Sequence, residues 1–233
     1  MDQPPGPSYA SRGGHKLAGA LDAFGYDPAG KRALDAGAST GGFTDVLLQR
    51  GARHVVAADV GYGQLVWALQ SDPRVTVLDR TNVRALEPAQ IGEPVELVVA
   101  DLSFIPLGLV LPALVRCATP TADLLPMVKP QFEVGRERLP TGGVVRDPEL
   151  RAETVRRVAA QAAVLGLGVR VEHDAGAGLD PDLALGGDQR ADADREVRRA
   201  VEAEVADRTA VPAAGVLFQI FDFLGGGLFG GSD

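Results

Sequence analysis

The sequence is poor in residues that cross-link chains or bind metals. Its 233 residues include one cysteine, Cys117, so an internal disulfide is excluded. Cys117 falls in an apolar helical pattern, which predicts a small core side chain. The three histidines, His15, His54 and His173, lack the spacing of a metal site, and we interpret them as surface or packing residues.

Long apolar runs and targeting signals are missing as well. No run approaches the roughly 20 apolar residues that a transmembrane helix needs, so no membrane partner is predicted. Residues 1–9 are polar and rich in proline, without the basic and apolar regions of a signal peptide. Together with the single cysteine, these features predict a cytoplasmic protein.

An excess of basic charge, the usual mark of a nucleic-acid partner, is also missing, since the net charge is −8. Residues 1–170 contain 18 acidic and 18 basic residues, whereas residues 171–233 contain 13 and 5. The negative excess therefore lies in the last quarter of the chain, away from the candidate catalytic residues. Net charge governs solubility and steering more than fold, so an RNA partner is not excluded.

What the sequence does contain is an alternation of short apolar segments with helical patterns. Strands are predicted over residues 33–36, 54–59, 75–78, 97–100, 124–128 and 169–171. Helices are predicted over residues 17–24, 43–50, 65–69 and 107–117, and between Asp147 as N-cap and Gly166 as stop. Nearly all-apolar strands that alternate with helices predict an α/β fold, a mostly parallel sheet with helices on both faces.

We expect three regions along the chain. Residues 1–10 are predicted to form a flexible tail, residues 11–172 a single domain, and residues 173–233 a divergent, acidic and glycine-rich segment that is in part disordered. Within the last region, residues 174–195 are predicted to be loop or disorder. Residues 194–207 have helical spacing, and residues 216–224 are apolar enough for a strand.

Polar residues follow the predicted strands directly. In parallel sheets the ligand binds at the carboxyl ends of the strands, so these residues become site candidates. They are Asp35, Asp59, Asp79, Asp101 and Lys129.

A glycine-rich turn over residues 35–43 connects the first strand to the next helix, and glycine there allows a ligand to approach the backbone closely. Asp59, 24 residues after Asp35, suits a ribose diol, a feature shared with NAD-binding proteins. Asp35 favours S-adenosylmethionine, because a carboxylate would repel a pyrophosphate but attract the ammonium group of a methionine moiety. A nucleotide-dependent oxidoreductase, or a turn that only links strand to helix, stays an alternative.

Two further residues follow the third strand. One interpretation is that Asp79 and Asn82 contact the edge of an adenine ring. The alternative is a simple turn in which Asn82 caps a helix. The predicted donor-binding residues are Asp35, Gly37, Ser39, Thr40, Gly41, Gly42, Phe43, Asp59, Asp79 and Asn82.

Lys16, Asp101 and Lys129 are the candidate catalytic residues. The ends of adjacent strands are about 5 Å apart, so Asp101 and Lys129 are expected to be neighbours, while nothing in the periodicity shows where the helix with Lys16 docks. A ribose hydroxyl attacks a sulfonium methyl group only after losing its proton, and a lysine acts as the base when burial or a second ammonium lowers its pKa. Considered alone, Lys129 is alternatively an ordinary surface lysine and Asp101 an acid in a turn.

Six stretches carry a family resemblance. The chain resembles the TlyA-type haemolysin/rRNA methyltransferases, a branch of the FtsJ-like ribose 2′-O-methyltransferases, over about residues 8–170. The matching stretches are residues 11–17 (SRGGHKL), 34–45 (LDAGASTGGFTD), 59–65 (DVGYGQL), 101–105 (DLSFI), 128–133 (VKPQFE) and 142–147 (GGVVRD).

The resemblance implies a Rossmann-like fold and a cytoplasmic enzyme that uses S-adenosylmethionine to methylate ribose 2′-hydroxyls of ribosomal RNA, typically cytidines of 16S and 23S rRNA. The family's catalytic Lys-Asp-Lys-Glu set implies roles for Lys16, Asp101 and Lys129, with Lys129 as the base. Its donor-binding motifs correspond to residues 35–42 and to Asp59.

Two departures from the family pattern are visible. The usual N-terminal S4-type RNA-binding domain is not in this sequence, so RNA affinity is expected to be weak or to come from a partner. Nothing after Arg170 matches the family's closing segment with its glutamate, and Glu172 has the wrong context, so no residue takes that role.

RNA, as ribosomal RNA or a ribosomal subunit, is the expected partner. Phosphate contacts are predicted for Arg12, Lys16, Arg136, Arg138 and Arg146, each of which is alternatively a solvated surface charge. Two alternative functions are kept, a catalytically degenerate donor- or RNA-binding family member and a membrane-active haemolysin. The second lacks the basic amphipathic helix that lies on membranes.

Overall fold

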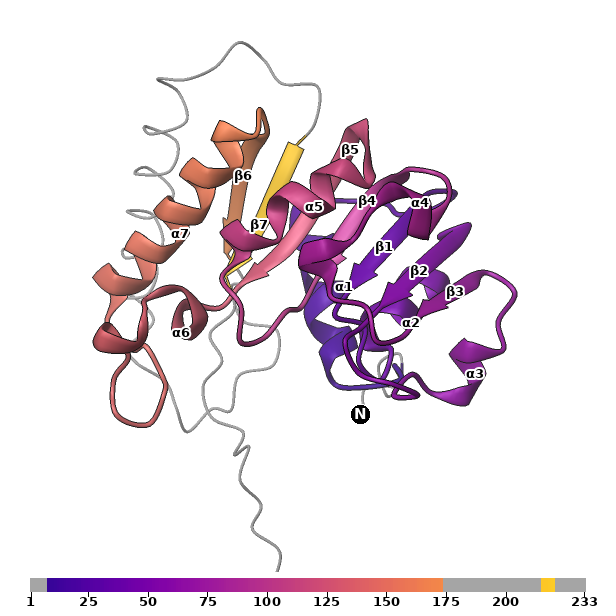
Figure 1. Ribbon diagram of the computed structural model, residues 1–233, viewed down its shortest axis with the longest axis horizontal. Helices are drawn as coiled ribbons and strands as arrows, with labels where there is room; N and C mark the ends of the chain where they lie inside the picture. Colours follow the sequence, from indigo (N-terminus) through magenta and orange to yellow (C-terminus); the bar gives the residue numbers. More distant parts are fainter. Residues whose placement is uncertain (1–7, 174–214, 221–233) are drawn as a thin grey trace, which may run out of the picture.

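The computed structural model of the chain describes residues 8–173 and 215–220. They form one open sheet with the strand order β3-β2-β1-β4-β5-β7-β6, and every pair of neighbouring strands is parallel (Figure 1). The strands are β1 (Arg32–Ala36), β2 (His54–Ala58), β3 (Val75–Leu78), β4 (Val95–Ala100), β5 (Ala118–Val128), β6 (Gly168–His173) and β7 (Gly215–Ile220). The predicted α/β fold with a mostly parallel sheet is confirmed.

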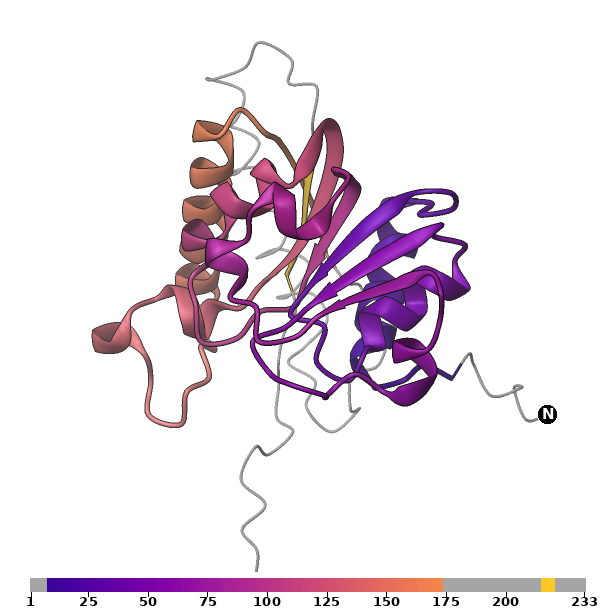
Figure 2. The same cartoon turned by 45° about the vertical axis from the view of Figure 1, so that its right-hand side comes forward.

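Helices cover both faces of the sheet (Figure 2). The α-helices are α1 (Gly13–Phe24), α2 (Gly42–Gln49), α3 (Trp67–Gln70), α4 (Pro88–Ile91), α5 (Leu111–Arg116), α6 (Pro130–Glu133) and α7 (Pro148–Val164). Three 3-10 helices connect them, η1 (Val83–Ala85), η2 (Leu107–Leu109) and η3 (Arg136–Arg138).

The alternation of side chains along the strands assigns each to one of two cores. On one face, Leu34 of β1 packs with residues of α4, α5 and α7, and Cys117 is fully buried in the same cluster, as predicted. On the other face, Ala33 packs with residues of α1, α2 and α3. Because both faces are covered, β1 is buried along its whole length, including Asp35.

The six strands predicted within residues 33–171 are confirmed, with bounds that agree within two residues except that β5 begins six residues before its predicted start. Helix α1 begins four residues before its predicted start. Gly25, after α1, takes the left-handed conformation with φ of 60°. Asp147 caps α7 by accepting a hydrogen bond from the Glu149 amide at 3.0 Å. Gly166, which was predicted to end this helix, has φ of 80°.

The helix predicted over residues 107–117 is wrong as one element. It divides into η2 and α5, and Pro112 lies in the first turn of α5. Proline lacks the amide hydrogen that a continuous helix needs in its interior, so a new helix begins just before it.

The strand predicted over residues 216–224 is confirmed as β7, which lies between β5 and β6. The sheet therefore takes one strand from the segment 173–233. Residues 221–224 lie outside the described residues, as do the loop over residues 174–195 and the helix over residues 194–207.

Two histidines pack as predicted. The ring of His15 lies edge-on to that of Tyr9, with 5.1 Å between centroids. His54 Nε2 is hydrogen-bonded to Thr76 Oγ1 at 2.9 Å. Within the part of the chain that the structure describes, no helix combines the length and the apolar character needed to span a membrane.

Candidate functional site

The carboxyl ends of β2, β1, β4 and β5 bring the candidate residues to one edge of the sheet, the lower edge in Figure 1. In the register of the sheet, Ala36 pairs with both Ala58 and Ala100, so the residues that follow these strands are neighbours. The Asp101 amide also donates to the Ala36 carbonyl at 3.2 Å. The strand ends therefore gather as the sequence predicted.

The turn after β1 depends on glycine at two positions. Gly37 and Gly41 have φ of 90° and 101°, which a residue with a Cβ rarely adopts. A Cβ on Gly37 would lie 3.0 Å from Leu102 Cδ2, and one on Gly41 would lie 2.3 Å from Leu69 Cδ1. Leu102 and Leu69 thus pack directly against the backbone of this turn, which side chains at residues 37 and 41 would prevent.

A third glycine decides where α1 docks. A Cβ on Gly42, at the start of α2, would lie 2.3 Å from Ser11 Oγ and 2.8 Å from the Gly14 nitrogen. The first turns of α1 and α2 therefore touch backbone to backbone. This contact, which no hydrophobic pattern predicts, sets the position of Lys16 two residues after Gly14.

Asp35 lies at the centre of the site and is fully buried. The Thr44 hydroxyl donates to Asp35 Oδ2 at 2.7 Å, whereas Oδ1 has no hydrogen-bond partner among the described residues. Burial raises the pKa of Asp35 to about 7, against the opposing effect of the Thr44 hydrogen bond. A buried carboxylate oxygen without a donor fits the ammonium of a methionine moiety, because a cation there would offset its loss of hydration.

Asp59 and Asp79 continue the acidic edge. Asp59 Oδ2 accepts a hydrogen bond from the Ser39 amide at 2.9 Å, and Oδ1 accepts one from the Gly61 amide at 2.7 Å. Asp79 Oδ2 accepts one from the Gly63 amide at 3.1 Å. Each oxygen keeps a second lone pair, so these carboxylates can still receive the hydroxyls of a ribose.

Asn82 caps η1, with Oδ1 accepting from the Arg84 amide at 3.1 Å. The capping interpretation is therefore confirmed, while a contact between Asn82 and a donor stays a prediction.

Lys16, Asp101 and Lys129 meet at this edge. Lys129 Nζ lies 2.6 Å from Asp101 Oδ1, and Lys16 Nζ lies 3.7 Å from Oδ2 of the same carboxylate. The side chains of Lys16, Asp101 and Lys129 are 27%, 20% and 15% exposed, so all three are largely shielded from solvent but reachable. One carboxylate thus holds two primary amines.

Ser103 is a contact that the sequence analysis missed. The ammonium of Lys129 donates to the Ser103 hydroxyl at 2.9 Å. Ser103 comes two residues after Asp101, so extending the strand-end rule by two positions would have identified it.

The neighbouring Phe104 was also missed. It is 86% exposed, has φ of 64°, and its ring centroid lies 5.0 Å from that of Phe132. An exposed aromatic ring, one residue after the Ser103 that contacts Lys129, is a surface on which a nucleic-acid base can stack.

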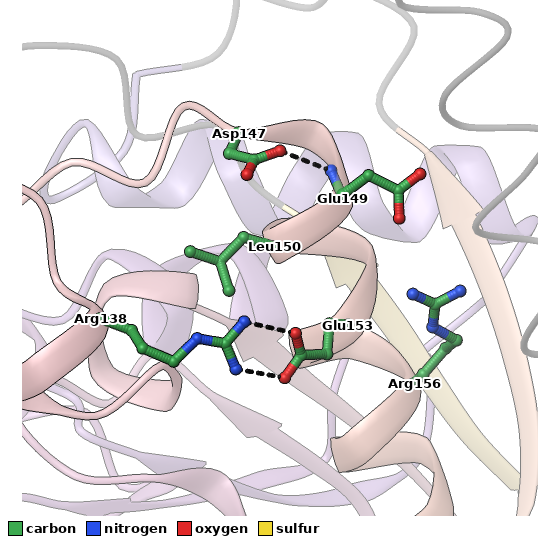
Figure 3. A pocket seen from close by; sticks show the side chains of 6 residues that line it. All are labelled: Arg138, Asp147, Glu149, Leu150, Glu153 and Arg156. Carbon is green, nitrogen blue, oxygen red and sulfur yellow. Dashed lines mark hydrogen bonds and ion pairs between the residues drawn. The ribbon is translucent and has the colours of Figure 1, made fainter.

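The predicted phosphate ligands do not all gather here. The guanidinium of Arg138 donates to both carboxylate oxygens of Glu153, at 2.6 Å and 2.5 Å, in a surface pocket at the start of α7 (Figure 3). That pocket is lined by Arg138, Asp147, Glu149, Leu150, Glu153 and Arg156. None of the three candidate catalytic residues lines it, and three of its six lining residues are acids, which disfavour a phosphate there.

An open parallel sheet with acids at successive strand ends and a glycine-rich turn after its first strand is the arrangement of a Rossmann-like α/β enzyme. A model of the FtsJ-like methyltransferase family matches residues 9–170, and the chain belongs to this family.

Individual relatives agree with this assignment. The 16S/23S rRNA (cytidine-2′-O)-methyltransferase TlyA of Mycobacterium tuberculosis is 65% identical over 159 residues, which are 68% of this chain and 59% of that protein. Hemolysin A of Brachyspira hyodysenteriae is 39% identical over 144 residues, 61% of this chain and 60% of that one. The resemblance to TlyA-type proteins is confirmed, and the chain spans about three fifths of the length of these relatives.

A solved structure is similar as well. That of a proposed hemolysin from Streptococcus thermophilus matches with a TM-score of 0.71 and 34% sequence identity, over 88% of this chain and 78% of that one. The similarity extends to a larger share of this chain than the matches to the two sequences do.

Proposed function

We propose that this chain transfers a methyl group from S-adenosylmethionine to a ribose 2′-hydroxyl of RNA, with ribosomal RNA in the cytoplasm as the substrate. The observation that carries the proposal is the pair of amines held by Asp101 at the edge where Asp35 and Asp59 line the glycine-rich turn. The names of the TlyA relatives support the choice of substrate. Residues 11–172 supply all the residues of this proposed site.

The donor would bind through the turn after β1. Its ammonium would face Asp35 Oδ1, which has no other partner among the described residues, and its ribose hydroxyls would face Asp59. Ser39, Thr40 and the glycines at 37, 41 and 42 would bring the backbone close to it, with Phe43 packed beneath in the core. When bound, S-adenosylmethionine supplies an electrophilic methyl group on a positively charged sulfur.

The chain's own residues would then move one proton. The neutral amine of Lys129 accepts the proton of the 2′-hydroxyl as the oxygen forms its bond to the methyl carbon. Asp101 orients both lysines and balances the ammonium that results, and Lys16 adds a positive charge beside the reacting oxygen. In the balanced reaction the ribose O–H bond and the S–CH3 bond of the donor would break and one O–CH3 bond would form. The proton would end on Lys129, and the donor would leave as the neutral thioether S-adenosylhomocysteine.

The presence of lysine rather than arginine at positions 16 and 129 supports a role in proton transfer over a purely structural ion pair. The chain has 23 basic residues, of which only three are lysines, at positions 16, 31 and 129. Two of these three contact Asp101. An arginine in either place would form an ion pair at least as well but could not give up its proton, so selective use of lysine favours acid–base chemistry.

A second function is kept because the family's closing glutamate has no counterpart in the sequence. A chain that binds the donor or RNA without turnover would show this pattern. The proposal is tested by incubating the chain with isotopically labelled S-adenosylmethionine and rRNA, and mapping the product to a 2′-O-methyl ribose. Saturable donor binding in a calorimeter without any methylated RNA would favour the second function, and tight binding of NAD instead would favour an oxidoreductase.

A further inference from the structure

Two loops at the site touch each other along their length. The β4 loop (101–107) follows β4 and contains Asp101, and the β5 loop (129–133) follows β5 and contains Lys129. Because β4 and β5 are adjacent in the sheet, the loops leave it side by side. They hold the two partners of the 2.6 Å ion pair, so their relative position decides whether that pair forms.

Three contacts join these loops in sequence order, and we name them the loop clasp. Lys129 Nζ donates to Ser103 Oγ at 2.9 Å. The ring of Phe132 packs against that of Phe104 at 5.0 Å. Last, the Leu107 amide donates to Glu133 Oε1 at 2.8 Å.

The Glu133 end of the clasp is buried. The Glu133 side chain is only 2% exposed, and burial raises the pKa of its carboxyl. Arg157 of α7 donates to the Glu133 carbonyl, and its guanidinium lies 3.7 Å from Oε2. A carboxylate so buried is costly unless it is paired, and here the Leu107 amide and Arg157 supply the pairing.

The Ser103 end of the clasp is exposed and strained. Phe104 has φ of 64°, a conformation that is strained for a bulky residue and persists only where its surroundings hold it. The loop that carries Ser103 therefore does not fix its own shape. Its order depends on contacts with the β5 loop.

We propose that Glu133 is a positioning residue, which locks the β5 loop onto the β4 loop and so holds the Lys129 amine against Asp101. The Glu133 carboxylate contacts the Leu107 amide and Arg157, and it acts on Lys129 through the loop clasp. An error of about 1 Å in the placement of a reacting group can cost roughly 100-fold in rate, so a rigid anchor four residues away has a large effect. The inference gives Glu133 a role in catalysis only if the proposed function holds.

The test measures the position of Lys129 without using methyl transfer. With three lysines in the chain, brief acylation followed by mass spectrometry reports each amine separately, and Lys31 serves as the internal reference. Releasing Lys129 from Asp101 and Ser103 would expose its side chain, which is only 15% exposed in the intact site, so its acylation relative to Lys31 rises. Thermal unfolding of every variant shows whether it is folded.

Two variants of Glu133 show whether its hydrogen bond from the Leu107 amide is the feature that matters. Glu133→Ala removes the acceptor for the Leu107 amide, and we expect acylation of Lys129 to rise by roughly threefold to tenfold as the loop opens and exposes its amine. Glu133→Gln keeps an acceptor of the same shape and should leave acylation near the wild-type level.

A second pair of variants covers the case in which Glu133→Ala does not fold. Arg157→Gln removes the cation from Glu133, whereas Arg156→Gln makes the same change one residue earlier on α7, in the surface pocket of Figure 3. Arg157→Gln should raise acylation of Lys129, and Arg156→Gln should not.

Unchanged acylation of Lys129 in Arg157→Gln and in folded Glu133→Ala would overturn the role of Glu133. The expected acylation pattern in a chain that methylates no RNA would refute the proposed function and leave the loop clasp standing. If the chain is active, Glu133→Ala should lower kcat while the affinity for the donor, measured by calorimetry, stays within about threefold.

Discussion

Gly14 and Gly42 approach so closely that a Cβ on Gly14 would lie 3.0 Å from the Gly42 carbonyl oxygen and 2.6 Å from the Cβ of Tyr9. These two residues lie in the first turns of α1 and α2, and their contact places the lysine of α1 at the strand ends. The position of Lys16 beside Asp101 is thus set by two residues that have no side chain.

This relationship predicts opposite effects for the same substitution at two positions of α1. Gly14→Ala must displace backbone or Tyr9, so we expect a loss of about 1–3 kcal/mol in the free energy of unfolding and a loss of methyl transfer. Gly19→Ala on the same helix meets nothing within 4 Å and should stabilise the protein by up to about 1 kcal/mol. Urea denaturation compares the two, and equal effects would contradict the close approach.

Asp35 predicts a pH dependence of stability. Its pKa is about 7 in the fold, against an ordinary value of 3.8, so between these values the native state holds a proton that the unfolded chain has lost. Its contribution is therefore fully present below about pH 4 and is lost as the pH rises through about 7. Asp35→Asn cannot ionise, so its stability relative to wild type should rise across this window by roughly 1–4 kcal/mol.

Chemical denaturation at pH values on either side of the window checks this prediction. Asp59→Asn is the control, because Asp59 is partly exposed and both its oxygens accept backbone amides. A stability difference between Asp35→Asn and wild type that does not change with pH would show that Asp35 is ionised throughout.

The same carboxyl predicts that donor binding releases a proton. The donor's ammonium favours the ionised form of Asp35, so below about pH 7 binding should release up to one proton. Calorimetric titrations with S-adenosylmethionine in buffers of unequal ionisation enthalpy measure this number directly. Release should vanish in Asp35→Asn, and release that persists there would assign the proton to another group.

Substitutions of Phe104 are expected to change RNA affinity and protein stability independently. Removing the ring with Phe104→Ala or Phe104→Gly should weaken RNA binding by about 5- to 100-fold, since stacking contributes roughly 1–3 kcal/mol per base. Phe104→Gly should in addition be the more stable of the two, because glycine adopts a φ of 64° without strain. Val164→Ala removes another exposed apolar side chain, far along α7, and should not alter RNA binding.

The parts of the fold that follow from local chemistry could be predicted from the sequence. Short apolar strands identified the sheet, with Asp35 next to last in β1 and Asp59 and Asp101 directly after β2 and β4. The parallel topology predicted that these residues would gather at one edge. The stop at Gly25 and the cap at Asp147 were also recognisable, because each depends on residues within one turn.

The parts that depend on contacts between distant segments could not be predicted. The docking of α1 depends on Gly14 and Gly42, 28 residues apart, and on the absence of side chains, which leaves no periodic signal. The loop clasp joins residues 26 or 28 positions apart, and only the pairing of β4 with β5 makes Glu133 a neighbour of Leu107. The split of the helix at Pro112 was visible in the sequence, but the apolar pattern around it obscured it.

The most direct test of the account replaces a lysine by arginine at two positions and measures methyl transfer from S-adenosylmethionine to rRNA. Lys129→Arg keeps a cation beside Asp101 but cannot give up its proton, and we expect the rate to fall by about 100-fold or more. Lys31→Arg makes the same change at the opposite edge of the sheet, where Lys31 is hydrogen-bonded to Tyr26, and should leave the rate unchanged. Methyl transfer at the wild-type rate in Lys129→Arg would contradict the assignment of Lys129 as the base.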